Sequence, residues 1–322
     1  MRYLLLLAPL LAACGEPSPP APPPVTTLIL EAKPIQGLVV DALIDNGWSS
    51  APELSVPLKG GGAGEVALRA AVDGQRFYLL AIWPDKEASQ SRYWKYEGDL
   101  KWAKFETEDA FSVCWSPGAL ADDFRKEGCA ITCHGDKHVY PGTGSGFLDF
   151  WYWGAQQCAL FQEARDMWLR QGDDQRLRGD RQPADSDNVP NVSDKYVGPS
   201  AFPQFRKAGD DRIVPFGRNL KEITPDWIRK YWKDEINIGR EVPLDLVRAR
   251  KGSRGDVIAV ARHYDEQGKW VLELARDLAT GNTDDLPLGL GPVLFAVAIH
   301  DNAAGAAHAI SGPIELTFAS AP

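Results

Sequence analysis

The sequence predicts a mainly β protein, built as an antiparallel β-sandwich that carries one polar insertion of loops and helices. Hairpin patterns lie near both ends of the chain, each with two apolar runs around a short turn. Strand patterns at both ends are typical of a sandwich whose two halves close one core. Apolar residues make up 44% of the chain and include 11 tryptophans, which is enough to fill a large core.

The first hairpin pattern lies at residues 66–83. Residues 66–72 form a largely apolar run, and residues 77–83 form a second run that is aromatic and aliphatic. The pair Asp73-Gly74 between them is a typical turn sequence. Residues 110–115 follow as a further buried strand pattern.

The middle of the chain, residues 154–250, is polar and charged and forms the predicted insertion. One helix is predicted where four apolar residues fall on one helical face: Leu160, Ala164, Met167 and Trp168. A second helix is predicted to begin at Thr224-Pro225-Asp226, because a hydroxyl side chain there precedes proline at the first helical position. We expect the insertion to cover one end of the sandwich and not to form a separate domain.

The C-terminal part repeats the hairpin spacing. Strand patterns at residues 257–264 and 270–274 flank a turn at residues 265–268. Strand patterns at residues 292–300 and 308–318 flank a loop of Gly, Ala and Asn. These strands complete the predicted sandwich.

Residues 1–14 resemble a bacterial lipoprotein signal peptide. Arg2 is followed by an apolar run and by a small-residue cleavage site that ends in Cys14. We expect Cys14 to carry the lipid, with an ordinary signal peptide as the alternative. Residues 15–30 form a Pro-rich linker and residues 31–322 a single domain. The expected location is the bacterial periplasm or cell surface, with a lipid anchor in the membrane.

The most specific motif is Cys129-Ala130-Ile131-Thr132-Cys133-His134. Two cysteines followed at once by histidine form the attachment signature of c-type haem, here with three residues between the cysteines instead of two. The thiols form thioethers with the haem vinyl groups, and the histidine becomes an axial ligand of iron. A zinc half-site and a local disulfide are the alternatives, although structural zinc needs about four ligands. The motif predicts one covalent haem c.

Cys114 and Cys158 remain once the other cysteines are assigned. In an oxidising compartment two such cysteines can pair, so we expect a Cys114–Cys158 disulfide. Two separate buried thiols are the alternative.

The net charge of −9 argues against a nucleic-acid partner, because phosphate binding needs a basic surface. The sequence contains no Ser-His-Asp set, phosphate loop or paired-carboxylate signature. We therefore expect no hydrolytic or phosphoryl-transfer activity.

Several further motifs follow one another along the chain: Val40-Asp41 to Trp48, residues 77–85, 109–113, 124–134, 149–153 and 251–257, Asp301-Asn302, and His308-Ala309-Ile310-Ser311. In this order they resemble the ethylbenzene dehydrogenase-type haem-binding domain family. That family includes c-type cytochromes and haem subunits of dimethyl sulfoxide reductase-type molybdoenzymes. The resemblance implies a β-sandwich with haem at one end and the insertion over that end.

The resemblance also implies a second axial ligand. The b-type members ligate iron through Met and Lys, and the Lys lies in a Lys-x-x-Ser pattern that His308-Ala309-Ile310-Ser311 matches with His in place of Lys. His134 and His308 are therefore the expected axial ligands, with a solvated loop-end role as the alternative for His308. Many c-type relatives carry His between two tryptophans, where this chain has Tyr152.

Other residues have two readings each. Trp151 and Trp153 either pack against the porphyrin or belong to the sandwich core. Met167 is a further thioether ligand in principle, but its place in the apolar helical stripe favours a core role. His263 and His300 lie in strand patterns and are expected to be structural.

The predicted function is that of a monohaem c-type cytochrome, which is not an enzyme and transfers single electrons between protein partners outside the cytoplasm. The partners are redox proteins, and the family implies a molybdoenzyme or another cytochrome among them. The first alternative is a five-coordinate haem protein that senses or reduces a small ligand. The second is a haem-free sandwich that acts as a binding module.

Overall fold

A computed structural model describes residues 27–43, 46–62, 64–99, 101–116, 124, 125, 128, 147–170, 189–190, 238–246, 252–283, 285–302 and 308–319. The strands are β1 (Leu28–Pro34), β2 (Leu54–Lys59), β3 (Glu65–Asp73), β4 (Arg76–Pro84), β5 (Gln90–Gly98), β6 (Lys101–Glu108), β7 (Ala110–Ser116), β8 (Phe147–Gly154), β9 (Arg165–Arg170), β10 (Val189–Pro190), β11 (Glu241–Pro243), β12 (Asp245–Leu246), β13 (Ile258–Tyr264), β14 (Lys269–Asp277), β15 (Val293–His300), β16 (Ala309–Ser311) and β17 (Ile314–Phe318). Short 3₁₀ turns occupy Asn46–Ser50, Gly252–Gly255 and Asp265–Gln267. The prediction of a mainly β protein is confirmed.

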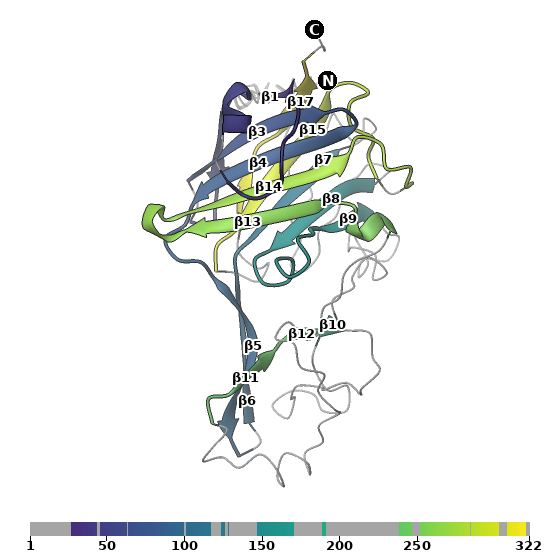
Figure 1. The fold of residues 1–322 in the computed structure, drawn as a ribbon. Coiled ribbons are helices and arrows are strands. Elements are labelled where there is room, and N and C mark those ends of the chain that lie inside the picture. The colour runs from purple at the N-terminus through teal and green to yellow at the C-terminus, as the bar shows by residue number, and fades with distance from the viewer. Residues whose placement is uncertain are drawn as a thin grey trace, which may run out of the picture.

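The strands form two layers that share one core (Figure 1). One layer has the order β13-β14-β4-β3, and the other has the order β15-β7-β8-β9. Along one side β1 pairs with β17 and β2 pairs with β16, so the two layers are joined there by hydrogen bonds. On the other side a bridge between Glu163 and Ile258 joins them again. Pairing is antiparallel except along β1, which is parallel to β3 and β17.

The predicted hairpins are confirmed with small shifts of their ends. β3 and β4 pair in register up to Asp73 and Arg76, with Gly74 at φ +60° in the turn. β13 and β14 pair in the same way. The strand expected at residues 308–318 is instead two strands, β16 and β17, because Gly312-Pro313 separates them. Proline lacks the N–H that a continuous ladder needs.

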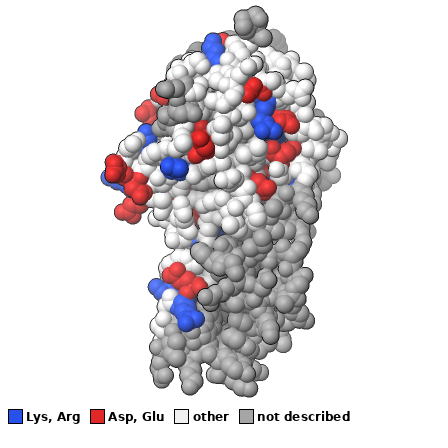
Figure 2. Space-filling view, in the orientation of Figure 1, with Lys and Arg blue, Asp and Glu red and all other residues white. Residues whose placement is uncertain are grey.

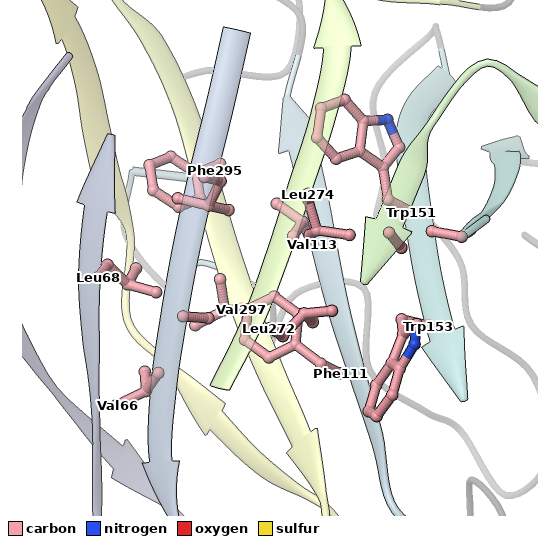
Figure 3. Close-up of a cluster of buried hydrophobic side chains, with 14 of the residues drawn as sticks. Val66, Leu68, Phe111, Val113, Trp151, Trp153, Leu272, Leu274, Phe295 and Val297 are labelled. Carbon is pink, nitrogen blue, oxygen red and sulfur yellow. The ribbon is translucent and has the colours of Figure 1, made fainter. Parts of the chain in front are cut away.

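The core between the layers is rich in aromatic side chains. Trp83 stacks on Phe111 at 5.5 Å between ring centroids and on Trp270 at 6.2 Å. Figure 3 shows Trp151 and Trp153 among the other buried side chains of this core. The tryptophans thus hold the two layers together.

The helix predicted around Leu160 to Trp168 is wrong. Residues 165–170 form strand β9, which pairs with β8 in the second layer. Asp166 and Met167 are both buried, so adjacent residues face opposite sides of a covered strand. Here the hydrogen bonds offered by β8 outweigh a local helical pattern. The helix predicted at Thr224 lies outside the described residues.

A three-stranded sheet of β5, β6 and β11 projects from the sandwich (Figure 1). Figure 2 shows acidic and basic side chains intermingled on this sheet. Within the described residues, no helix has the length and apolar composition needed to cross a membrane.

A buried ion pair crosses the core between the layers. Arg276 of β14 lies 2.7 Å from Asp149 of β8, and neither side chain is exposed to solvent. The Arg276 guanidinium also donates to Leu286 O at 2.6 Å and lies over the Trp151 ring at 4.7 Å. Burial raises the pKa of Asp149 to about 6, although Arg276 acts in the opposite direction. Asp149 therefore depends on the cation to stay charged in the core.

We predict that Arg276→Gln lowers the free energy of unfolding by about 3–5 kcal/mol, because it leaves the Asp149 carboxylate buried without its cation. The matched control is Arg76→Gln, since Arg76 pairs with Asp277 on the surface at 3.1 Å. An exposed pair contributes about 1 kcal/mol or less. Urea denaturation measures both changes, and equal losses in the two variants would contradict a central role for the buried pair.

Candidate functional site

Side-chain alternation divides the second layer into an inner and an outer face. In β7 the inner residues Phe111, Val113 and Trp115 belong to the main core. Ser112 and Cys114 alternate with them and lie on the opposite side. We call this opposite side of β16, β15, β7, β8 and β9 the outer face.

The centre of the outer face consists of small side chains. Ser112 pairs in register with Ala298 of β15 and with Tyr152 of β8. Ser112, Ala296 and Ala298 are all almost fully buried. Larger side chains surround these three small ones, namely Phe150, Tyr152, His300, His308 and Ile310.

Three rings follow one another across this face. His308 directly precedes β16, and its ring centroid lies 4.8 Å from that of His300 at the end of β15. The His300 ring lies 5.9 Å from Tyr152 in an edge-to-face arrangement. Arg165 of β9 covers the Tyr152 ring at 5.5 Å. Burial, and after it the Glu108 carboxylate, raises the pKa of Tyr152, so its hydroxyl keeps its proton at neutral pH.

Phe124, Arg125 and Gly128, described residues shortly before the predicted haem attachment motif, pack on the same side of the second layer. Phe124 is buried in one cluster with Cys114, Leu148, Leu294 and Ala296. Arg125 lies 3.3 Å from Glu315 of β17. Gly128, directly before Cys129, has φ +58°, and a Cβ there would lie 2.8 Å from Gly312 C and from Pro313 N. Glycine is therefore the residue that fits between the motif and the end of β16.

The Gly128 contact lies at the end of the strand that His308 precedes. Gly312 and His308 lie at opposite ends of β16, which at strand spacing places them roughly 13 Å apart. His134 follows Gly128 by six residues, a length of chain that spans at most about 20 Å. Cys129, Cys133 and His134 themselves lie outside the described residues. The described part of the chain thus allows His134 and His308 to approach one group.

The outer face brings small side chains and aromatic rings together. Ser112 and Ala298 are almost fully buried, and imidazole and phenol rings lie beside them. Imidazole is a common axial ligand of haem iron. His308 is half-buried and His300 is buried. The two histidines lie on one face but are accessible to solvent to different extents.

Trp151 and Trp153 do not belong to this face. They alternate with Tyr152 in β8 and point into the core, where they are 1% and 2% exposed. Both belong to the main core cluster (Figure 3), which fits the second interpretation, a role in the sandwich core. Met167 is on the outer face opposite Phe150, on a strand and not on a helix. Four strand spacings, about 19 Å, separate its strand from β16.

The expected Cys114–Cys158 disulfide is also corrected, since both residues are present as thiols. Cys114 belongs to the cluster on the outer face, whereas Cys158 belongs to the core cluster inside the sandwich. The sheet therefore separates the two sulfur atoms. Cys158 Sγ donates instead to Tyr152 O at 3.7 Å.

Sequence reasoning missed His300 as a member of this site. It lies in a strand pattern that also fits a purely structural residue. Its place beside His308 follows from the β15–β16 register, in which Ile299 pairs with Ala309. Only the pairing of the two strands reveals this neighbour.

One family model matches most of the chain. A family model described as ethylbenzene dehydrogenase matches residues 45–309. A carbohydrate binding module of family 9 from Caldicellulosiruptor kristjanssonii in complex with glucose aligns at 8% identity and a TM-score of 0.36, covering 91% of this chain and 97% of that chain. The same module in complex with cellotriose aligns at 8% identity and a TM-score of 0.35, covering 90% of this chain and 94% of that chain. The comparison with curated proteins gave no match.

We predict that Gly128→Ala destabilises the protein more than Gly74→Ala, the matched control. Both glycines have φ near +60°, but a Cβ at Gly74 meets no atom within 4 Å whereas one at Gly128 meets backbone. The left-handed backbone alone costs about 1–2 kcal/mol in each variant. Thermal unfolding and the yield of covalent haem test the difference, and equal effects in both variants would argue against a docked motif.

Proposed function

Because the chain belongs to the ethylbenzene dehydrogenase family, we propose that it is a monohaem c-type cytochrome that transfers single electrons between protein partners. One observation carries this proposal. The segment that enters the attachment motif packs through Gly128 against the end of β16, and His308 lies at the other end of the same strand. Gly128, which directly precedes the motif, and a histidine of the family pattern therefore lie at the two ends of one strand.

In this proposal Cys129 and Cys133 hold the haem covalently, and His134 and His308 are its axial ligands. Haem supplies an iron that takes up and releases one electron. The chain positions His308 through β16, which pairs with β15 in one layer and with β2 at the edge of the other. The His300 ring limits the orientation of the His308 ring, at 37° between the two planes.

Two histidine ligands leave no open position for a substrate, which supports electron transfer and not catalysis. Tyr152 keeps its proton and Ser112 is neutral, so the outer face adds no negative charge at these positions. The protein sets the potential through its ligands, burial and nearby charges. We therefore propose that the chain is not an enzyme but a carrier or an electron-transfer partner of one.

The proposed location is the bacterial periplasm or cell surface. The cleavage pattern that ends in Cys14 supports a lipid anchor in the membrane, and covalent haem attachment fits an exported protein. The proposed partners are redox proteins, among them a molybdoenzyme or another cytochrome, as in the haem subunits and cytochromes of this family. The net charge of −9 argues against a role in nucleic-acid binding.

We predict that His308→Ala converts a low-spin c-type spectrum to a high-spin one, because it removes an axial ligand. The matched control on the same face is His300→Ala, which we expect to stay low-spin. His263→Ala is a distant control, since His263 lies on β13 and contacts Asp265 at 2.6 Å. Visible spectra of the matured full chain, oxidised and reduced, measure all three variants.

Other results would change the assignment. A low-spin His308→Ala together with a high-spin His300→Ala would transfer the ligand role to His300. An immediate and complete spectral shift of the wild type with carbon monoxide would favour the five-coordinate sensor or reductase. Absence of covalent haem after competent maturation would overturn the cytochrome and favour the haem-free binding module.

A further inference from the structure

Three aspartates meet at one end of the sandwich, where strands of both layers end or begin. Asp85 follows β4, Asp109 precedes β7 and Asp301 follows β15. Each offers one carboxylate oxygen, and these oxygen atoms all lie within 4.8 Å of one another. Residues far apart in the sequence thus form one acidic cluster.

The buried members of the cluster are held in place by the fold. Asp109 is fully buried, and its Oδ2 accepts hydrogen bonds from Ser89 N at 2.6 Å and from Trp270 Nε1 at 3.1 Å. Its Oδ1 accepts from Asn302 N at 2.8 Å. These bonds orient the carboxylate, and its remaining lone pairs can still bind a cation.

Asp85 shows that the cluster is incomplete. Its residue is only 8% exposed, and its Oδ1 accepts one hydrogen bond, from Glu87 N at 3.1 Å. Its Oδ2 is buried and has no hydrogen-bond partner among the described residues. A buried carboxylate oxygen without a partner is costly, so such an atom calls for a ligand.

No described lysine or arginine balances the charge of the cluster. None of the Lys and Arg side chains in that part of the chain forms an ion pair with Asp85, Asp109 or Asp301. His263 lies beside the cluster: its Nε2 is 3.0 Å from the Asp85 carbonyl oxygen, and its charge lowers the pKa of Asp85. Burial, and after it the Asp109 carboxylate, raises the pKa of Asp85 to about 6. The same two causes raise the pKa of Asp301.

We propose that Asp85, Asp109 and Asp301 bind one Ca²⁺ ion. Calcium takes oxygen ligands at about 2.3–2.6 Å, so two ligands of one ion lie at most about 5 Å apart. The three carboxylate oxygen atoms lie within 4.8 Å of one another, which this geometry allows. Asp301 is exposed, which leaves the remaining coordination positions to water. Magnesium binds oxygen at about 2.1 Å in a stricter octahedron, so we expect it to bind more weakly.

A second acidic cluster, formed by Asp166, Asp256 and Asp285, has a cation of the protein beside it. Arg276 lies 3.5 Å from Asp166 and 3.7 Å from Asp285. Asn282 Nδ2 donates to Asp256 and to Asp285, each at 3.1 Å. Asp256 Oδ1 is also buried without a hydrogen-bond partner among the described residues, so the positive charge of Arg276 is what distinguishes this cluster from the first.

Bound calcium would connect β4 of one layer to β7 and β15 of the other. Asp301 directly follows His300, and Asn302 bonds to Asp109. The ion would therefore fix the start of the chain that leads from β15 to His308. This positional effect rests on the proposed function, whereas calcium binding itself does not.

Calorimetric titration of the matured full chain with Ca²⁺, after treatment with a chelator, tests the site. We expect one ion per chain, and a loss of affinity of at least about tenfold in Asp85→Asn and in Asp301→Asn. Asp301 is exposed, so its variant tests the site even if Asp85→Asn does not fold. The matched control is Asp256→Asn of the second cluster, which we expect to bind as the wild type does.

Absence of calcium binding in the wild type would overturn the proposal. Binding that is lost in Asp256→Asn and kept in Asp85→Asn and Asp301→Asn would overturn it as well, because the ion would then lie in the second cluster. A thermal unfolding midpoint that calcium raises in the wild type but not in Asp301→Asn would support it. The haem spectrum tests the proposed function separately from the calcium site. If the wild type binds calcium while the His308→Ala variant stays low-spin, the axial-ligand assignment fails and the calcium site stands.

Discussion

The structure depends on the two-residue alternation of side chains in strands that are covered on both faces. In β7, β8 and β15 the inner residues fill an aromatic core, and the outer residues form the floor and border of the proposed haem face. A shift of one residue in the register of β8 would exchange Tyr152 for Trp151 or Trp153 on the outer face. The tryptophan core that fixes this register thus also fixes the site.

Local patterns were sufficient for the hairpins. The β3–β4 pair could be predicted because its apolar runs and its Asp73-Gly74 turn lie within one short stretch. Strand β9 could not be predicted, because Met167 and Trp168 fit a helical face equally well. Only pairing with β8 decides between a helix and a strand. Local periodicity is thus informative where the partner strand is the next one along the chain.

Only those residues of the site that belong to a sequence motif could be predicted. The residues 129–134 and His308 are visible as motifs, whereas the position of His300 beside His308 depends on the β15–β16 register. Cys114 and Cys158 look like a pair in sequence, yet they lie on opposite sides of one sheet. The three aspartates are separated by long stretches of sequence, so their meeting follows from the sandwich topology alone.

His308 occupies a position that both layers control. Its strand β16 has only three residues, too few to hold a ligand through its own ladder. The strand pairs with β15 in one layer and with β2 in the other, and Gly128 packs against its far end. A relative movement of the layers would therefore displace His308 from the outer face. The buried Arg276–Asp149 pair and the acidic cluster at the end of β4 and β15 both connect these layers, so each restrains the position of the proposed axial ligand.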